Sequence, residues 1–308
     1  MNKNELIMLQ ALPLEIKVAK SKLRIIEWVR HYGVENVYIS FSGGKDSTVL
    51  LDLVRSEFPE IEAVFVDTGL EYPELKEFVK LFDNVTILRP KMSFKQVIET
   101  YGYPMISKEQ ANYLDDIRNG TEYMKIRRLE GDVKGRFKLS KKYRYLINAP
   151  FNISSKCCNV MKKAPVKLYE KETGKVPFIG TMADESLLRM QSYMKNGCNA
   201  FNSKRPLSSP MGFWKQQDVL EYIYNNNLKI APVYGEVIKE DDIFKTTLCD
   251  RTGCIFCGFG VHLEKEPNRY QRLEKTHPQL HEYCMENLGF KEVCKFMNIE
   301  YKGEWFIW

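Results

Sequence analysis

The chain has 308 residues, of which 44% are hydrophobic and 28% are charged, and its formal net charge is +6. This composition is typical of a globular protein with a sizeable core and excludes a low-complexity chain. No apolar run approaches the roughly 20 residues of a membrane-spanning helix, and the N-terminus lacks the apolar core of a signal peptide. We therefore expect a soluble, cytoplasmic protein with no membrane partner.

The apolar pattern along the chain predicts short strands that alternate with helices. The predicted strands cover residues 34–41, 61–66, 84–90 and 176–183. The predicted helices cover residues 13–31, 46–57, 72–80, 94–101, 108–118 and 216–225. Such alternation indicates an α/β fold with a doubly wound, mostly parallel sheet.

Three segments are expected from this pattern: a helical segment over residues 1–33, an α/β domain over 34–262 and a mostly helical extension over 263–308. Within the domain, residues 120–148 form a basic insertion. Its basic residues are Lys125, Arg127, Arg128, Lys134, Arg136, Lys138, Lys141, Lys142 and Arg144. The insertion is either a solvated helical excursion or a positive surface for an anionic substrate or nucleic acid.

The stretch "SGGKDS", Ser42 to Ser47, stands between a predicted strand and a predicted helix. Backbone N–H groups and the helix dipole favour an anion at such a helix start. Gly43 and Gly44 permit close approach of the backbone, Ser42 and Ser47 supply hydroxyl groups, and Lys45 supplies a positive charge. The spacing is not that of a Walker loop, because the glycines directly precede the lysine.

This loop resembles the pyrophosphate-binding (PP) loop of the N-type ATP pyrophosphatases, whose Rossmann-like fold is of the adenine nucleotide alpha hydrolase type. The resemblance implies that residues Ser42, Gly43, Gly44, Lys45, Asp46 and Ser47 bind the phosphates of ATP with Mg²⁺, with Lys45 and Asp46 catalytic. Asp67 follows the next predicted strand, at the sheet edge where open α/β folds bind ligands. Asp67 is therefore either a nucleotide-binding residue or an ordinary turn residue.

Eight cysteines in a reducing compartment argue for metal or redox chemistry rather than disulfides. Five of them group in the sequence, at Cys157, Cys158, Cys249, Cys254 and Cys257. Cys198, Cys284 and Cys294 stand alone and are expected to be buried as small side chains.

The segments "SSKCCNVMKKAPV" and "CDRTGCIFCGFG" resemble the cluster-binding motifs of sulfonucleotide reductases, the phosphoadenosine phosphosulfate (PAPS) reductase family. The resemblance implies a [4Fe–4S] cluster on Cys157, Cys158, Cys254 and Cys257, with Cys249 as a spare ligand or persulfide carrier. The alternatives are Zn²⁺ held by Cys249, Cys254, Cys257 and one of Cys157 or Cys158, and plain buried thiols without a metal. The segment "GTMADESLLR" resembles the family's arginine-bearing segment, which implies that Ser186 and Arg189 lie near the anionic end of the nucleotide, with Arg189 catalytic.

Two departures from the reductases shape the expected function. No cysteine follows Cys294, so the C-terminal nucleophilic cysteine motif of the reductases is not found, and the phosphate loop is intact. The chain therefore resembles the ATP pyrophosphatases of DNA phosphorothioation. This resemblance implies an adenylating sulfurtransferase that cleaves ATP to AMP, or an adenylate, and pyrophosphate. Its implied partners are a nucleic-acid acceptor and a cysteine desulfurase. The alternatives are a sulfonucleotide reductase and a non-catalytic nucleotide- or nucleic-acid-binding module of a larger complex.

Overall fold

The computed structural model describes residues 2–303, which divide into two compact units. Unit 1 comprises the chain up to Asp67 with Glu71–Arg89 and Pro165–Thr252. Unit 2 comprises Thr68–Leu70, Pro90–Ala164 and the chain from Gly253. These boundaries differ from the expected segments, because the chain leaves unit 1 and returns twice. The basic insertion and the described part of the expected extension share unit 2, and residues 304–308 of that extension lie outside the described residues.

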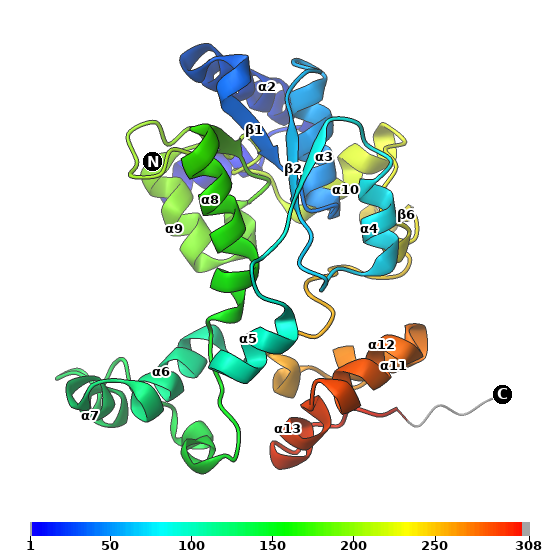
Figure 1. The fold of residues 1–308 in the computed structure, drawn as a ribbon. Helices are drawn as coiled ribbons and strands as arrows, with labels where there is room; N and C mark the ends of the chain where they lie inside the picture. Colours follow the sequence, from blue (N-terminus) through cyan, green and yellow to red (C-terminus); the bar gives the residue numbers. More distant parts are fainter. Residues whose placement is uncertain (1, 304–308) are drawn as a thin grey trace. The chain divides into compact units, whose positions relative to one another are not determined.

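Unit 1 is built on a four-stranded parallel sheet in the order β3-β2-β1-β5. Figure 1 labels two of its strands, β1 and β2. Its strands are β1 (Val37–Ser40), β2 (Ala63–Val66), β3 (Val85–Leu88) and β5 (Val176–Phe178). Its helices are α1 (Lys3–Gln10), α2 (Leu14–Tyr32), α3 (Lys45–Arg55), α4 (Pro73–Val79), α8 (Ala164–Thr173, from the unit boundary), α9 (Leu187–Asn196) and α10 (Gln216–Asn225). The strands are shorter than expected, because residues 34–36 form a 3₁₀ turn and the chain after Phe178 leaves the sheet.

Alternate residues of the strands pack on opposite faces of this sheet. Val37 and Ile39 join a core that includes α2, α3 and α10, whereas Tyr38 and Val64 pack with Tyr169 of α8. Helices thus cover both faces, which confirms the doubly wound parallel α/β architecture. β1 and β5 are neighbours on either side of the point where the strand order reverses, and doubly wound sheets bind ligands at that point.

An antiparallel hairpin in unit 1, β6 (Val237–Glu240) with β7 (Ile243–Thr246), was not expected from the apolar pattern. Its two turn residues, Asp241 and Asp242, have φ angles of 47° and 62°. Two consecutive residues with positive φ are typical of two-residue hairpin turns. Aspartate adopts this left-handed conformation more readily than most residues. The "DD" pair was therefore the available signal.

Unit 2 is mostly helical. Its helices are α5 (Phe94–Tyr101), α6 (Lys108–Asn119), α7 (Glu122–Glu130), α11 (Arg269–Thr276), α12 (Pro278–Glu282) and α13 (Phe290–Phe296), and β4 (Met105–Ile106) pairs with β8 (Gly258–Phe259). Stacked rings join the early and late parts of this unit: Phe94 lies 6.2 Å, between ring centroids, from both Phe256 and Phe290. None of the helices within residues 2–303 has the length and hydropathy needed to cross a bilayer.

Candidate functional site: the loop between β1 and α3

The loop after β1 adopts a conformation that requires glycine. Gly43 has a φ of 72°, and a Cβ atom there would lie 2.7 Å from Leu75 Cδ2 and 2.8 Å from Val79 Cγ2. Gly44 is the N-cap of α3 and provides no capping side chain. The backbone N–H groups of the first turn are therefore available to an anion.

Two serine hydroxyl groups hold the loop closed on itself. Ser47 Oγ accepts from the backbone N–H of Ser42 at 3.1 Å and lies 3.0 Å from Ser42 Oγ. Ser47 Oγ also donates to the carbonyl oxygen of Gly44 at 2.9 Å. Ser47 is buried whereas Ser42 is exposed, so Ser42 presents the hydroxyl group that a ligand can reach.

Lys45 is buried against a segment far away in the sequence. Its ammonium group donates to the carbonyl oxygen of Asp250 and lies 5.5 Å from the centroid of the Tyr234 ring. The Tyr234 hydroxyl is 3.1 Å from Thr252 Oγ1. A Cβ atom on Gly44 would lie 3.3 Å from the same Tyr234 hydroxyl. Tyr234 and residues 249–252, none of which the loop motif indicates, therefore flank the phosphate loop.

The Asp46 side chain in this loop has a buried oxygen atom, Oδ1, without a hydrogen-bond partner in the described part of the chain. Burial raises the pKa of its carboxyl group above the ordinary value, while the Lys45 charge acts in the opposite direction. A buried carboxylate oxygen beside a phosphate loop fits Mg²⁺, which prefers oxygen ligands and commonly bridges carboxylate and phosphate.

Arg189 lies in a charged cluster beside the loop. Glu185 forms ion pairs with both Arg189 and Arg251, the second at 3.2 Å. The charges of these three residues also act on the pKa of Asp46. Arg251 was not identified as a site residue from the sequence. The one sequence feature that could have indicated it is its position three residues before Cys254. The cluster therefore places two guanidinium groups close enough to act on the Asp46 carboxyl group.

Two further predicted residues have partners within unit 1. Asp67 forms ion pairs with Lys76 at 3.0 Å and Arg89 at 3.9 Å. Ser186 is the N-cap of α9, and its Oγ accepts from the backbone N–H of Arg189 at 3.3 Å. The structure thus assigns Ser186 a capping bond that orients the helix carrying Arg189.

The four predicted cluster cysteines all lie in unit 2. Burial, together with the nearby charges of Cys158, Cys254 and Cys257, raises the pKa of the Cys157 thiol to about 12. The two cysteine pairs are therefore neighbours, and their four sulfur donors fit either an iron–sulfur cluster or zinc by donor type. Within residues 2–303, no three histidine, cysteine or carboxylate side chains converge as a metal-ligand set.

Cys249 belongs to unit 1, whereas the other four grouped cysteines belong to unit 2. Its Sγ donates to the carbonyl oxygen of Arg251 at 3.0 Å, and its own carbonyl accepts from Thr246 Oγ1 at 3.1 Å. Cys249 thus begins the segment whose next residue contacts Lys45.

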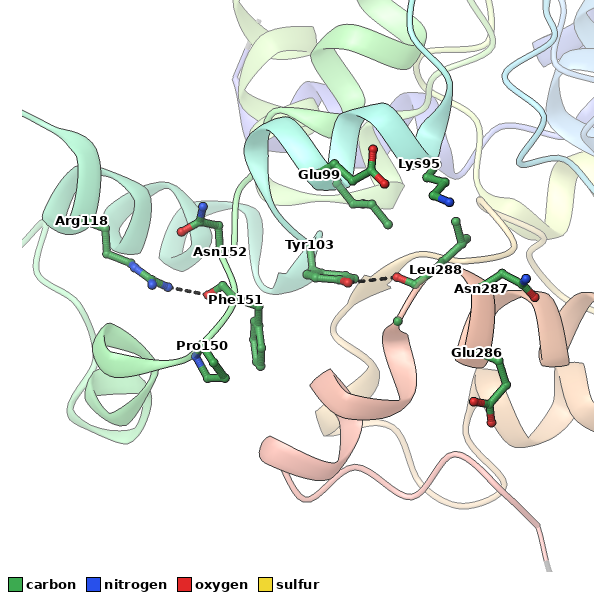
Figure 2. A pocket seen from close by; sticks show the side chains of 12 residues that line it. Lys95, Glu99, Tyr103, Arg118, Pro150, Phe151, Asn152, Glu286, Asn287 and Leu288 are labelled. Carbon is green, nitrogen blue, oxygen red and sulfur yellow. Dashed lines mark hydrogen bonds between the residues drawn. The ribbon is translucent and has the colours of Figure 1, made fainter.

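Unit 2 also contains an open pocket of about 600 Å³ (Figure 2). Glu99 and Glu286 face it together with Lys95 and Tyr103, and the guanidinium group of Arg118 is bound to the carbonyl oxygen of Phe151. The arginine in the lining is thus already bound to a backbone carbonyl group. The lining also has two carboxylates and one lysine, so this pocket is not suited to bind a phosphate.

Comparison with known proteins identifies the family. The model of the phosphoadenosine phosphosulfate reductase domain matches residues 36–135 and 133–259. The chain belongs to this family. The matched residues include the phosphate loop, the Glu185 cluster and all five grouped cysteines, so the resemblance inferred from the motifs is confirmed at the level of the family.

Individual relatives are distant. An uncharacterized protein of Methanocaldococcus jannaschii, MJ0973, is 25% identical over 78% of this chain, which spans only 44% of that protein's length. An adenosine 5'-phosphosulfate reductase of Geobacillus kaustophilus is 24% identical over 68% of this chain and 72% of its own. The U34-tRNA thiolase of Methanococcus maripaludis, solved with its [4Fe-4S] cluster, overlaps 95% of this chain and 84% of its own with 15% identity and a TM-score of 0.36. An overlap this weak carries no information about activity.

Proposed function

We propose that this family member binds Mg²⁺-ATP at residues 42–47 and cleaves it between the α- and β-phosphates. An acceptor oxygen attacks the α-phosphorus, the bond to the bridging oxygen breaks, and pyrophosphate leaves. The adenylated acceptor is then attacked by a sulfur nucleophile, and AMP departs with the original oxygen. The observation that carries the proposal is the intact loop, with Lys45 buried beside the phosphate-binding backbone.

The residues of unit 1 have distinct tasks in this proposal. The N–H groups at the start of α3 and the Lys45 ammonium group bind the β- and γ-phosphates and stabilise the leaving pyrophosphate. Asp46 would hold Mg²⁺, which would supply positive charge to neutralise the phosphates. Arg189 and Arg251, oriented by Glu185, stabilise negative charge that develops at the α-phosphate.

The four cysteines of unit 2 would hold the metal group, for which a [4Fe–4S] cluster is favoured over zinc because two cysteines are adjacent. Such a cluster would supply electron-transfer or sulfide chemistry. A cysteine desulfurase is the proposed source of sulfur, and Cys249, beside the loop, is the proposed site of a persulfide.

The second candidate is reduction of a sulfonucleotide, which the family and its named reductases support. Both functions use an adenine nucleotide, but only ATP cleavage needs a site for β- and γ-phosphates. The nucleotide preference therefore separates the two candidates.

The test is calorimetry on anaerobically purified protein, titrated with Mg²⁺-ATP and with adenosine 5'-phosphosulfate. We expect tighter binding of ATP, weakened roughly 10- to 100-fold in Lys45→Ala, because a charge-assisted hydrogen bond contributes about 1.5–3 kcal/mol. Lys167→Ala, at an exposed position of α8, is the control and should bind as the wild type does. Tighter binding of the sulfonucleotide would reject the proposal in favour of the reductase.

A further inference from the structure

The net charge of the chain is confined to the basic insertion. Residues 120–148 contain nine lysines and arginines and three acidic residues, a balance of +6. The remaining 37 basic and 37 acidic residues of the chain cancel. A chain that is neutral elsewhere and concentrates its positive charge in one segment has the charge pattern of a polyanion-binding surface.

The insertion is a folded element, which excludes a purely disordered basic arm. After α7 the chain turns back, and the backbone N–H of Leu139 donates to the carbonyl oxygen of Arg128 at 2.7 Å. Arg128 is buried, forms an ion pair with Asp116 at 2.7 Å and also bonds the carbonyl oxygen of Phe137 at 3.3 Å. This arginine therefore holds the insertion together and does not belong to its surface.

Four lysines remain for an external anion. All four are exposed, and in the described part of the chain none of them forms an ion pair. They are Lys134, Lys138, Lys141 and Lys142. By contrast, Lys125 and Arg136 are paired with Glu122 and Asp132 within the insertion.

Exposed aromatic rings accompany these lysines. Phe137 is 40% exposed and Tyr123 is 66% exposed. The guanidinium groups of Arg127 and Arg136 lie 5.1 Å and 5.4 Å from the centroid of the Phe137 ring, and Arg127 donates to the Tyr123 hydroxyl at 2.9 Å. Arginine planes and exposed rings are the groups on which unpaired nucleobases stack.

Phe137 is also held in an unfavourable backbone conformation. Its φ angle of 64° places a bulky aromatic residue in the left-handed region, which such residues rarely adopt. A strained residue that exposes its ring to solvent gains nothing from core packing. Strain of this kind gathers at ligand-binding positions.

We propose that the basic insertion binds single-stranded nucleic acid, with the four lysines on phosphates and the rings of Tyr123 and Phe137 on unstacked bases. This inference deepens the proposed function and rests on it in one respect, namely that the bound strand is the acceptor. Charge alone would serve an anionic bilayer equally well. The arginine-flanked rings favour a strand with exposed bases.

The test is fluorescence anisotropy with a labelled 20-nucleotide single strand, as DNA and as RNA, without ATP and across 50–200 mM salt. The test variant replaces Lys134, Lys138, Lys141 and Lys142 by glutamine. The matched control replaces four exposed lysines of unit 1, Lys167, Lys171, Lys204 and Lys229, with the same change in charge. We expect the test variant to bind at least tenfold more weakly, with the slope of log K against log salt shallower by about 3, since each phosphate contact on a single strand contributes about 0.7. The control should keep the slope of the wild type.

Phe137→Ala supplies an independent reading, since removing a stacked base partner weakens binding by roughly tenfold without changing the salt slope. An equal loss in the control variant, or no binding by the wild type, would overturn the inference. The inference would also be overturned if the protein bound vesicles of anionic phospholipid as tightly as the strand and Phe137→Ala left strand binding unchanged. ATP calorimetry on the wild-type protein keeps the two proposals apart. Strand binding without ATP binding removes only the proposed function, and ATP binding without strand binding removes only this inference.

Discussion

At the scale of single residues, side-chain packing distinguishes two glycines that share one backbone conformation. Gly43 and Gly174 both have φ angles of 72°. A Cβ on Gly43 would meet the side chains of Leu75 and Val79, whereas a Cβ on Gly174 would meet nothing within 4 Å. The two positions therefore separate the effect of the φ angle from the effect of crowding against α4.

We predict that Gly43→Ala loses ATP binding by at least tenfold and lowers the free energy of unfolding by about 1–3 kcal/mol, the range for strained backbone positions. Gly174→Ala should lower stability by about 1–2 kcal/mol, the left-handed penalty alone, and leave ATP binding unchanged. Urea unfolding and calorimetry on both variants check this. Equal ATP affinities in the two variants would show that the loop does not need this close packing.

At the scale of elements, a buried ion pair joins α2 to α10. Lys17 Nζ lies 2.7 Å from both carboxylate oxygens of Asp218 and donates to the carbonyl oxygen of Gln10 at 2.9 Å. Only 2% of the Lys17 side chain is exposed. Asp218 also accepts from the backbone N–H of Lys215 at the start of α10. The pair thus fixes where these two helices meet.

Lys17→Met should lower the free energy of unfolding by about 3–5 kcal/mol, because it leaves the Asp218 charge buried without its partner. Lys17→Met combined with Asp218→Asn should recover part of the loss, since the uncompensated charge is then removed. Urea unfolding of the three proteins measures the difference. A double variant as unstable as the single one would show that packing, not charge, dominates at this position.

At the scale of the whole molecule, the two cysteine pairs and the glycine loop of residues 42–47 are assigned to different units. Cys157, Cys158, Cys254 and Cys257 belong to unit 2, and Cys249 belongs with the loop to unit 1. A metal group would join two segments of unit 2 that are far apart in sequence. Binding to the folded state alone raises stability by mass action, so such a group would stabilise that unit.

Anaerobic reconstitution with iron and sulfide should therefore give bound iron and acid-labile sulfide and a higher unfolding temperature. The double variant Cys157→Ser with Cys158→Ser should bind little of either. Cys249→Ser is the matched control and should bind both as the wild type does. Stoichiometric zinc in the purified protein without sulfide would support the zinc alternative, and loss of iron in the Cys249 variant would add that residue to the ligands.

Much of the fold followed from local pattern, because strands and helices of unit 1 carry their periodicity in a few neighbouring residues. The phosphate loop was likewise recognisable, since its glycines, lysine and serines are contiguous. The hairpin β6–β7 and the pair β4–β8 were missed, because strands of two to four residues carry too little pattern to stand out.

The sequence by itself determined the family and the parallel α/β architecture, because both depend on local patterns, and it predicted a phosphate-binding role for residues 42–47. Only the tertiary structure decided what surrounds them: Tyr234 and Asp250 against Lys45, and Arg251 beside Arg189 through Glu185. It also decided that the chain crosses repeatedly between two units. Contacts between residues far apart in the chain form only when burial of the cores brings their segments together, and no local pattern encodes that step.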